Sequence, residues 1–316
     1  MCASGLSFEG AAQYFVWGVE RQSRLIESVL MRIPLPVFYL AENPDGKLVV
    51  VDGLQRLTTF QRFLENKLPL QLENSELKGK TFDDLPPKLQ NRIEDTQITL
   101  YIIDAKVPDR ARLDIFERVN GGVALSRQQM RNAIYQGKAT VLLRDLARDP
   151  TFLNATGKSL HSTTMRDREA INRFCAFFLL GWADYRDDMD QFLGDALNRM
   201  NRMTEDEIEA LKSSFLRSMR NSIAVFGKHA FRKRESGQEN RKQLNMSLFD
   251  VFSTGLARYN ETVVSNNQTL LQEGFYKLMQ QAEFLKDITY GTNGRLRVVG
   301  RFQATQKLLV EVLGAV

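Results

Sequence analysis

The spacing of hydrophobic and polar positions divides the chain into two halves with different patterns. The first half opens with apolar residues at helical spacing on one face: Leu25, Ile26, Val29 and Leu30. The Ile-Pro-Leu-Pro stretch at residues 33–36 should end this helix, because proline cannot continue a helix and disfavours helical geometry in the residue before it. The pattern therefore predicts an amphipathic helix followed by a proline-rich connection.

Short aliphatic and aromatic runs come next and indicate strands. Residues 37–40 and 47–51 are two such runs, and the turn-forming cluster Ala-Glu-Asn-Pro-Asp-Gly between them predicts a β-hairpin. The remaining predicted elements of this half are a helix at 55–66, a strand at 68–72, a helix at 85–95 and a strand at 97–104. Mixed helices and strands in this order predict an α+β unit.

After residue 105 the strand patterns fade and helical patterns replace them. Ser126 lies three residues before Gln129, the spacing of a capping box at a helix start. Helical apolar spacing covers residues 109–120, 126–137, 167–185, 205–227, 245–259, 269–285 and 301–314. We therefore expect a mixed N-terminal domain at 1–145 and an all-helical C-terminal domain at 146–316.

Composition limits the class of protein. The chain has 316 residues, of which 43% are hydrophobic and 26% charged, so it is long enough to bury its own cores. No apolar run is long enough to span a membrane, and the N-terminus lacks the pattern of a secretory signal, which together predict a cytoplasmic protein without membrane contact. The two cysteines, Cys2 and Cys175, match no metal or redox spacing, and Cys175 is expected to be a buried thiol.

The formal net charge of +5 is concentrated in one stretch. Residues 217–242 hold eight basic residues against two acidic ones, a density that can meet DNA phosphates. A solvated helix face followed by a charged loop explains the same composition, and both interpretations stay open. The DNA-binding candidates in this stretch are Arg217, Arg220, Lys228, Arg232, Lys233 and Arg234.

The stretch Val-Val-Asp-Gly-Leu-Gln-Arg, residues 50–56, joins the second predicted strand to a helix. In one interpretation Asp52 caps the helix while Gln55 bonds back to the Asp52 amide. In the other, Gly53 lets main-chain N–H groups approach an anion at the helix N-terminus, and Arg56 adds a planar set of donors. Arginine in a first helical turn is otherwise unfavourable, because the helix dipole repels it, so the anion interpretation is preferred.

Four blocks of the sequence stand out together: RQSRLIESVLMRIPLPVFYL, VVDGLQRLTTFQRFL, IFERVNGGVALSRQQMRNAIYQG and MRDREAINRFCAFFL. In this order they resemble the GmrSD-type restriction endonuclease N-terminal domain family. The resemblance implies an N-terminal domain similar to the ParB and sulfiredoxin fold, followed by helices, and a role in bacterial defence against phage or foreign DNA.

The family motif, Asp-Gly-Gln-Gln-Arg, is linked to nucleotide binding and hydrolysis. Here it becomes Asp52-Gly53-Leu54-Gln55-Arg56, with leucine in place of the first glutamine. The resemblance implies a nucleoside triphosphate with Mg²⁺ as cofactor and Asp52 and Arg56 as catalytic residues. The cofactor-binding candidates are Gly53, Gln55, Arg56, Arg24, Glu27 and Asn120.

Two enzyme activities are not expected. Sulfiredoxin chemistry needs a cysteine within the motif, where this chain has Leu54 and Gln55. The two histidines, His161 and His229, lie in no nuclease context, and no metal site is predicted. Cleavage of DNA would then belong to a partner nuclease chain.

Two functions remain open, and homo-oligomerisation is compatible with both. The first is a nucleotide-hydrolysing component of a restriction-type system that acts on DNA. The second is a ParB-like module that binds DNA or a partner, with a vestigial nucleotide pocket and no turnover.

Overall fold

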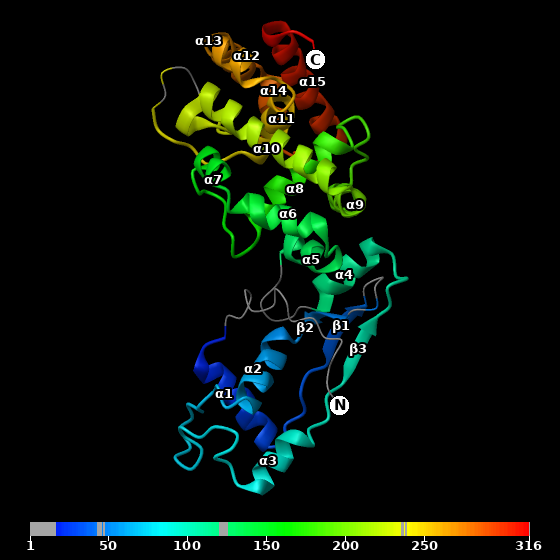
Figure 1. Cartoon of the computed structure of the whole chain (residues 1–316), viewed down its shortest axis with the longest axis vertical. Coiled ribbons are helices and arrows are strands. Elements are labelled where there is room, and N and C mark those ends of the chain that lie inside the picture. Colours follow the sequence, from blue (N-terminus) through cyan, green and yellow to red (C-terminus); the bar gives the residue numbers. More distant parts are fainter. Residues whose placement is uncertain are drawn as a thin grey trace. The chain divides into compact units, whose positions relative to one another are not determined.

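A three-stranded mixed sheet and the helices around it form the N-terminal part of the protein (Figure 1). The computed structural model describes residues 17–42, 46, 48–119, 126–234, 237 and 239–315. The chain divides into two compact units, residues 1–125 and 126–316. The sequence pattern places the domain boundary 20 residues later, at 145, because it does not reveal that the helices after residue 125 pack with those of the C-terminal unit.

The sheet of unit 1 has the strand order β2-β1-β3. Strand β1 pairs antiparallel with β2 and parallel with β3, so the predicted hairpin is confirmed. The strands are β1 (Phe38–Glu42), β2 (Leu48–Asp52) and β3 (Leu100–Ile103); the helices are α1 (Val19–Leu30), α2 (Leu54–Leu64), α3 (Pro87–Glu94) and α4 (Asp109–Val119).

A hydrophobic cluster fills the space between α1, α2 and α3. Phe63 of α2 is fully buried and contacts Phe82 edge to face, with the ring centroids 6.0 Å apart. The predicted strand at 68–72 is wrong. Its alternating leucines, Leu68, Leu70 and Leu72, do enter this cluster, but Leu70 exchanges main-chain hydrogen bonds with Gly79 and Lys80 in a loop.

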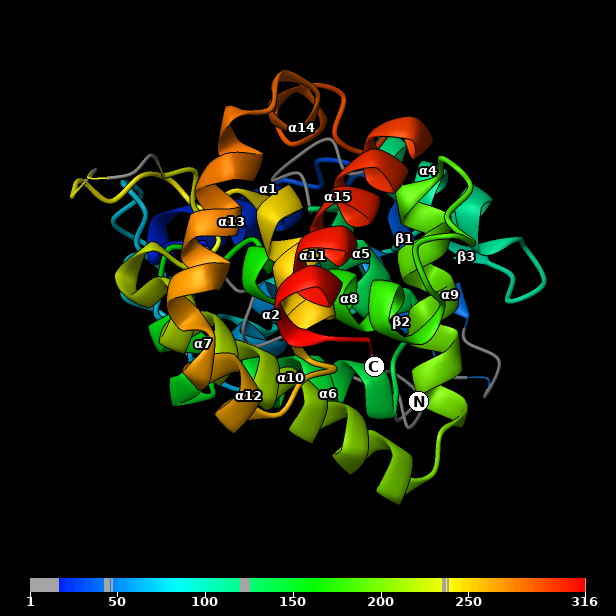
Figure 2. The ribbon, with the colours of Figure 1, turned by 90° about the horizontal axis from the view of Figure 1, so that it is seen from above.

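Unit 2 is helical throughout its described residues, apart from one isolated β-bridge between Arg232 and Leu244. Helix α11 packs against α8, α10 and α15 (Figure 2). The helices are α5 (Arg127–Ile134), α6 (Lys138–Ala147), α7 (Pro150–Thr156), α8 (Arg166–Leu179), α9 (Met189–Arg202), α10 (Glu205–Phe226), α11 (Met246–Leu256), α12 (Glu261–Asn266), α13 (Gln268–Gln280), α14 (Ala282–Asp287) and α15 (Arg295–Leu313).

Two local predictions for unit 2 are confirmed. Ser126 caps α5 by accepting a hydrogen bond from the Gln129 amide, and the Gln129 side chain accepts one from the Ser126 amide in return. Cys175 is fully buried in α8.

The order of the elements, a sheet followed by helices, confirms the predicted α+β class. None of the described helices is long and apolar enough to cross a membrane.

Candidate functional site

The Asp-Gly turn of the motif joins the end of β2 directly to the start of α2. Gly53 has φ of 98°, in the left-handed region where a side chain is strained. A Cβ at this position would lie 2.3 Å from Cδ1 of Phe38, so glycine is also required by close packing. Both the backbone conformation and the neighbouring ring therefore account for glycine here without a ligand.

The interpretation of Asp52 and Gln55 as a capping box at the start of α2 is wrong. The N-cap residue is Gly53, and no side chain caps the helix. The Asp52 carboxylate instead accepts a hydrogen bond from Arg56 Nη2 at 2.7 Å, four residues further on. The first turn of α2 thus has neither an acidic residue nor a side-chain cap, although an anion would be favoured at such a helix start.

Arg56 holds the first turn of α2 against the segment that leads into β1. Its guanidinium donates to the carbonyl oxygens of Pro36 and Val37, the second at 3.1 Å, in addition to the Asp52 carboxylate. The same group lies over the Phe38 ring, with Cζ 4.3 Å from the centroid. Only 9% of the residue is exposed. Arg56 is therefore a structural clamp in this conformation, and it would have to leave some of these partners to bind a phosphate.

Gln55 contacts the start of the domain rather than the turn. Its Oε1 accepts a hydrogen bond from the Trp17 amide at 3.1 Å. The Trp17 carbonyl accepts one from Gln22, whose own Oε1 accepts one from Arg62 of α2. Two segments far apart in the sequence, residues 17–22 and α2, are joined in this way. Gln22 is only 1% exposed, and its role was missed because a glutamine between charged and small residues gives no sign of burial.

The other candidate residues near the motif are more exposed than Arg56. Arg24 is exposed and Glu27 half-buried on α1, and among the described residues they form no ion pair with each other. No described contact joins either side chain to Asp52 or Arg56. Leu54, the departure from the family motif, is the first residue of α2 and is half-buried. Asn120 lies outside the described residues.

The basic stretch of unit 2 does not form one open surface. Arg232 is 1% exposed and donates to the carbonyls of Ala230 and Thr156 and to Ser159 Oγ. Burial, reinforced by Arg241, lowers the pKa of Arg232 to about 10. Arg232 therefore cannot contact DNA in this position, because its buried guanidinium binds the last carbonyl of α7, that of Thr156, and the carbonyl of Ala230.

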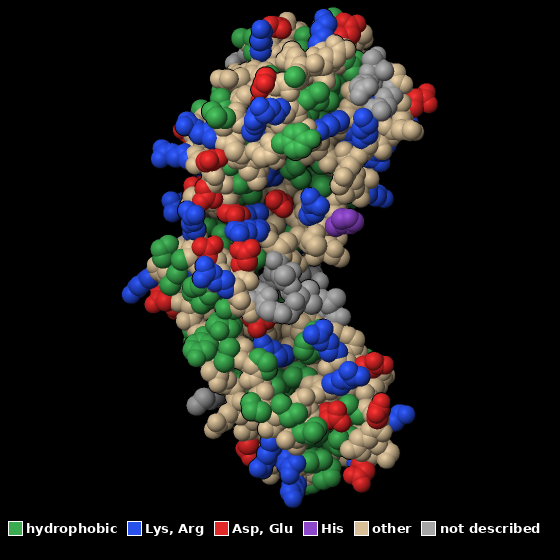
Figure 3. All heavy atoms as spheres, turned by 180° about the vertical axis from the view of Figure 1, so that it is seen from behind, with side chains coloured by type: hydrophobic (Ala, Val, Ile, Leu, Met, Phe, Trp, Pro, Cys, Tyr) green, Lys and Arg blue, Asp and Glu red, His purple; other side chains and the backbone are tan. Residues whose placement is uncertain are grey.

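The remaining basic candidates differ in their availability. Arg220 is exposed but pairs with Glu261 at 2.8 Å, and the half-buried Arg217 donates to the Ala257 carbonyl. Lys233 donates to Thr289 Oγ1, and Arg234 lies 6.0 Å from the Tyr276 ring centroid. Lys228 is exposed. On the face seen in Figure 3, Lys and Arg side chains are interspersed with Asp and Glu.

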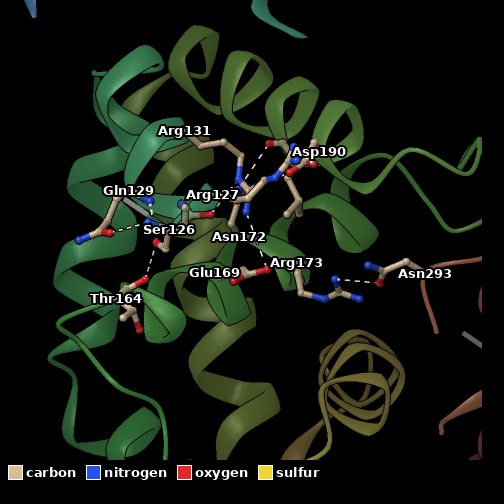
Figure 4. A network of polar contacts seen from close by, with 12 residues as sticks. Ser126, Arg127, Gln129, Arg131, Thr164, Glu169, Asn172, Arg173, Asp190 and Asn293 are labelled. Atoms are coloured by element: carbon tan, nitrogen blue, oxygen red, sulfur yellow. Dashed lines mark hydrogen bonds and ion pairs between the residues drawn. The ribbon is translucent and has the colours of Figure 1, made fainter. Parts of the chain in front are cut away.

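A buried network of arginines and carboxylates connects the helices of unit 2. Figure 4 shows Arg131 of α5 pointing toward Asp190 of α9, and the same guanidinium lies 3.8 Å from Glu169 of α8. Arg173 binds Asp250 through two hydrogen bonds of 2.8 and 2.6 Å, and Arg301 donates to the same carboxylate at 3.0 Å.

This network has a structural role. Asp250 and Arg301 have no exposed surface, and Arg173 is 4% exposed, so Asp250 is a buried carboxylate between two buried guanidiniums. It ties α8, α11 and α15 together. The sequence does not reveal this cluster, because only the packing of α8, α11 and α15 brings Arg173, Asp250 and Arg301 together.

Among the described residues no group of three or more His, Cys, Asp or Glu side chains could hold a metal ion. His161 is exposed, while His229 is 6% exposed and has its pKa lowered by burial and then by nearby basic residues, Arg234 first among them. Burial raises the pKa of the Cys175 thiol well above its usual range, so this cysteine is unreactive.

The strand–turn–helix motif of unit 1 lies within a segment that matches a known protein family. Residues 13–136 match the family described as GmrSD restriction endonuclease, N-terminal domain. The chain therefore contains a GmrSD-type N-terminal domain, and the resemblance seen in the sequence is confirmed. No curated protein and no solved structure matches the chain.

Proposed function

We propose that this protein is a nucleotide-binding component of a bacterial restriction-type defence system that acts on foreign DNA. The observation that carries the proposal is the family match over residues 13–136, which includes the motif from Asp52 to Arg56. The uncapped start of α2 supports an anion there, because main-chain N–H groups and the helix dipole favour phosphate at such a position.

The residues at this turn fit a nucleotide with Mg²⁺ in part. Asp52 supplies one carboxylate with 27% of its side chain exposed, and Mg²⁺ bound to a nucleotide is commonly held by one or two carboxylates together with the phosphates. Bound there, the ion would neutralise phosphate charge. Asp52 would first have to share or leave its contact with Arg56, so the pair would rearrange when the ligand binds.

We also propose that the bound nucleotide is hydrolysed. Arg56 would stabilise charge on the transferred phosphoryl group only after leaving the carbonyls of Pro36 and Val37. Leu54 also replaces an amide of the family motif with an apolar side chain. A partner nuclease chain would perform any cleavage of DNA.

Phosphate release by the full-length protein with ATP, GTP or CTP and Mg²⁺ tests the hydrolysis clause. Leu54→Gln restores the family motif at a half-buried position and should increase turnover if the missing amide limits it. Leu64→Gln, on a leucine of the same helix that is 45% exposed, is the matched control and should change nothing. If a nucleotide binds but neither variant hydrolyses it, the proposal would be reduced to nucleotide binding.

The alternative function is a DNA- or partner-binding module without turnover, and the internal engagement of Arg56 favours it. Its test is DNA affinity as a function of salt, because each phosphate contact contributes to the slope. Lys228→Ala should reduce that slope by about one if the basic stretch meets DNA. Lys307→Ala, on an exposed lysine of α15, is the control for a general charge effect.

A further inference from the structure

A cavity lies between the end of α1 and helix α3 in unit 1. Its volume is about 620 Å³, which is within the range of small-molecule sites. The end of α1 with the connection that follows it, α3, and residues 95–97 line the cavity. The two helices pack together, and Arg92 of α3 donates a hydrogen bond to the Leu30 carbonyl of α1 at 3.0 Å. No residue of the motif at 52–56 lines this cavity, so it is distinct from the turn before α2.

Basic side chains outnumber acidic ones around the cavity. Arg32, Lys88 and Arg92 line it together with one carboxylate, Asp95, so three positive charges and one negative charge give the lining a net charge of +2. Among the described residues none of these four side chains is in an ion pair. The Nε of Arg92 is also buried without a hydrogen-bond partner in that part of the chain. An anion in the cavity would supply the missing counter-charge.

Arg32 occupies a backbone position that usually belongs to glycine. Helix α1 ends in a Schellman motif, in which the Ile33 amide donates to the Ser28 carbonyl and the Arg32 amide to the Val29 carbonyl, both at 2.9 Å. Arg32 follows the C-cap residue of this motif and has φ of 59°, in the left-handed region that strains any residue with a Cβ. An arginine that is kept at a strained position suggests a role for its side chain, which lines the cavity.

Four apolar residues line the same cavity. They are Val29, Ile33, Pro34 and Leu35, and Ile33 is 48% exposed. Apolar side chains beside a group of cations suit a ligand that joins an anionic group to an apolar or aromatic body. An inorganic ion alone would leave these apolar side chains in contact with water.

We propose that this cavity binds a phosphate monoester with an apolar or aromatic body. Such a group carries a charge of about −1.5 to −2 at neutral pH, which matches the net charge of the lining, whereas a carboxylate would neutralise only half of it. The planar guanidiniums of Arg32 and Arg92 can bind phosphate oxygens through paired N–H groups, and the Lys88 ammonium adds a point charge. This site does not depend on the proposed binding of a nucleotide at the start of α2.

Titration calorimetry of the full-length protein with phenyl phosphate tests the proposal. Binding should be saturable, and tighter than that of inorganic phosphate, which lacks the apolar body, or of benzoate, which lacks the second charge. Arg32→Gln and Lys88→Gln should each weaken it by about fivefold or more, because each removes a charge-assisted hydrogen bond. Lys78→Gln is the matched control, on an exposed lysine of unit 1 that does not line the cavity, and should leave binding unchanged. The proposal is overturned if phenyl phosphate does not saturate the protein, binds no better than the other two probes, or binds Arg32→Gln and Lys88→Gln as it binds the wild type.

Three further variants separate binding from folding and from the motif. Arg32→Gly relieves the left-handed strain, so it should raise the stability of unit 1 in a urea titration and still weaken phenyl phosphate binding. Asp95→Asn should tighten binding, because it removes the carboxylate that opposes an anion. Asp52→Asn, at the turn before α2, should bind phenyl phosphate like the wild type. Wild-type affinity in Arg32→Gly, or lost affinity in Asp52→Asn, would place the probe elsewhere and overturn the assignment to this cavity.

Discussion

Replacing Arg56 with alanine should destabilise unit 1 even when no ligand is present. The change removes the hydrogen bonds to the carbonyls of Pro36 and Val37, the ion pair with Asp52, and the contact of the guanidinium with the Phe38 ring. A buried hydrogen bond to a charged group contributes about 1.5–3 kcal/mol, and an exposed cation–π contact about 0.5–1 kcal/mol.

The loss of stability should be smaller than the sum of these contributions, because water can replace part of the contacts of Arg56. Pro36 is exposed and the Asp52 side chain is 27% exposed, so solvent screens the ion pair and can reach the Pro36 carbonyl. We therefore expect Arg56→Ala to lower the free energy of unfolding of unit 1 by about 2–4 kcal/mol. Arg56→Lys should recover little of it, because one ammonium cannot reproduce a planar fork of donors.

Urea unfolding followed by tryptophan fluorescence measures this loss. The chain has two tryptophans, Trp17 in unit 1 and Trp182 in unit 2, so Trp182→Phe leaves Trp17 as the reporter for unit 1. Arg144→Ala, on an exposed arginine of α6 in unit 2, is the control and should change the unfolding of unit 1 by less than about 0.5 kcal/mol. A loss below about 1 kcal/mol for Arg56→Ala would refute the clamp.

Three further changes have defined outcomes. Gly53→Ala should lower the stability of unit 1 by roughly 1–3 kcal/mol, measured by the same urea titration, because φ of 98° strains a side chain that also meets Phe38; unchanged stability would mean that the turn can relax. Asp250→Leu should cost unit 2 about 3–5 kcal/mol, since Arg173 and Arg301 lose their buried counter-charge, and a calorimetric melt that does not move would contradict that. Burial raises the pKa of Asp167 above its usual value, so its contribution to stability is present at acid pH and lost as pH rises through the folded pKa. Asp167→Asn should therefore raise the melting temperature at neutral pH more than at acid pH, and a gain that is larger in acid would reverse the sign of the argument.

The periodic elements could be predicted because their signals are local. The hairpin of β1 and β2, helix α2 and the capping box of α5 follow from spacing, turn residues and cap residues within a few positions of one another. The strand expected at 68–72 failed for a non-local reason. Its leucines alternate as in a strand, but their burial comes from a loop that packs on α1, α2 and α3.

The roles of the motif residues could not be predicted from the sequence. The two carbonyl groups that accept hydrogen bonds from Arg56 lie 19 and 20 residues away, and Gln55 accepts from Trp17, 38 residues away. The burial of Arg232 depends in the same way on Thr156, 76 residues earlier. Charge and spacing identified where these residues cluster, whereas tertiary packing decides which of them are available to a ligand.

Calorimetric titration of the full-length protein with ATP, GTP and CTP in the presence of Mg²⁺ tests the proposed function most directly. We expect saturable binding of at least one of these nucleotides, weakened by Asp52→Asn and unchanged by Arg144→Ala, which lies in unit 2. Wild-type protein that binds none of the three would contradict it, and the motif from Asp52 to Arg56 would then be only the structural junction between β2 and α2.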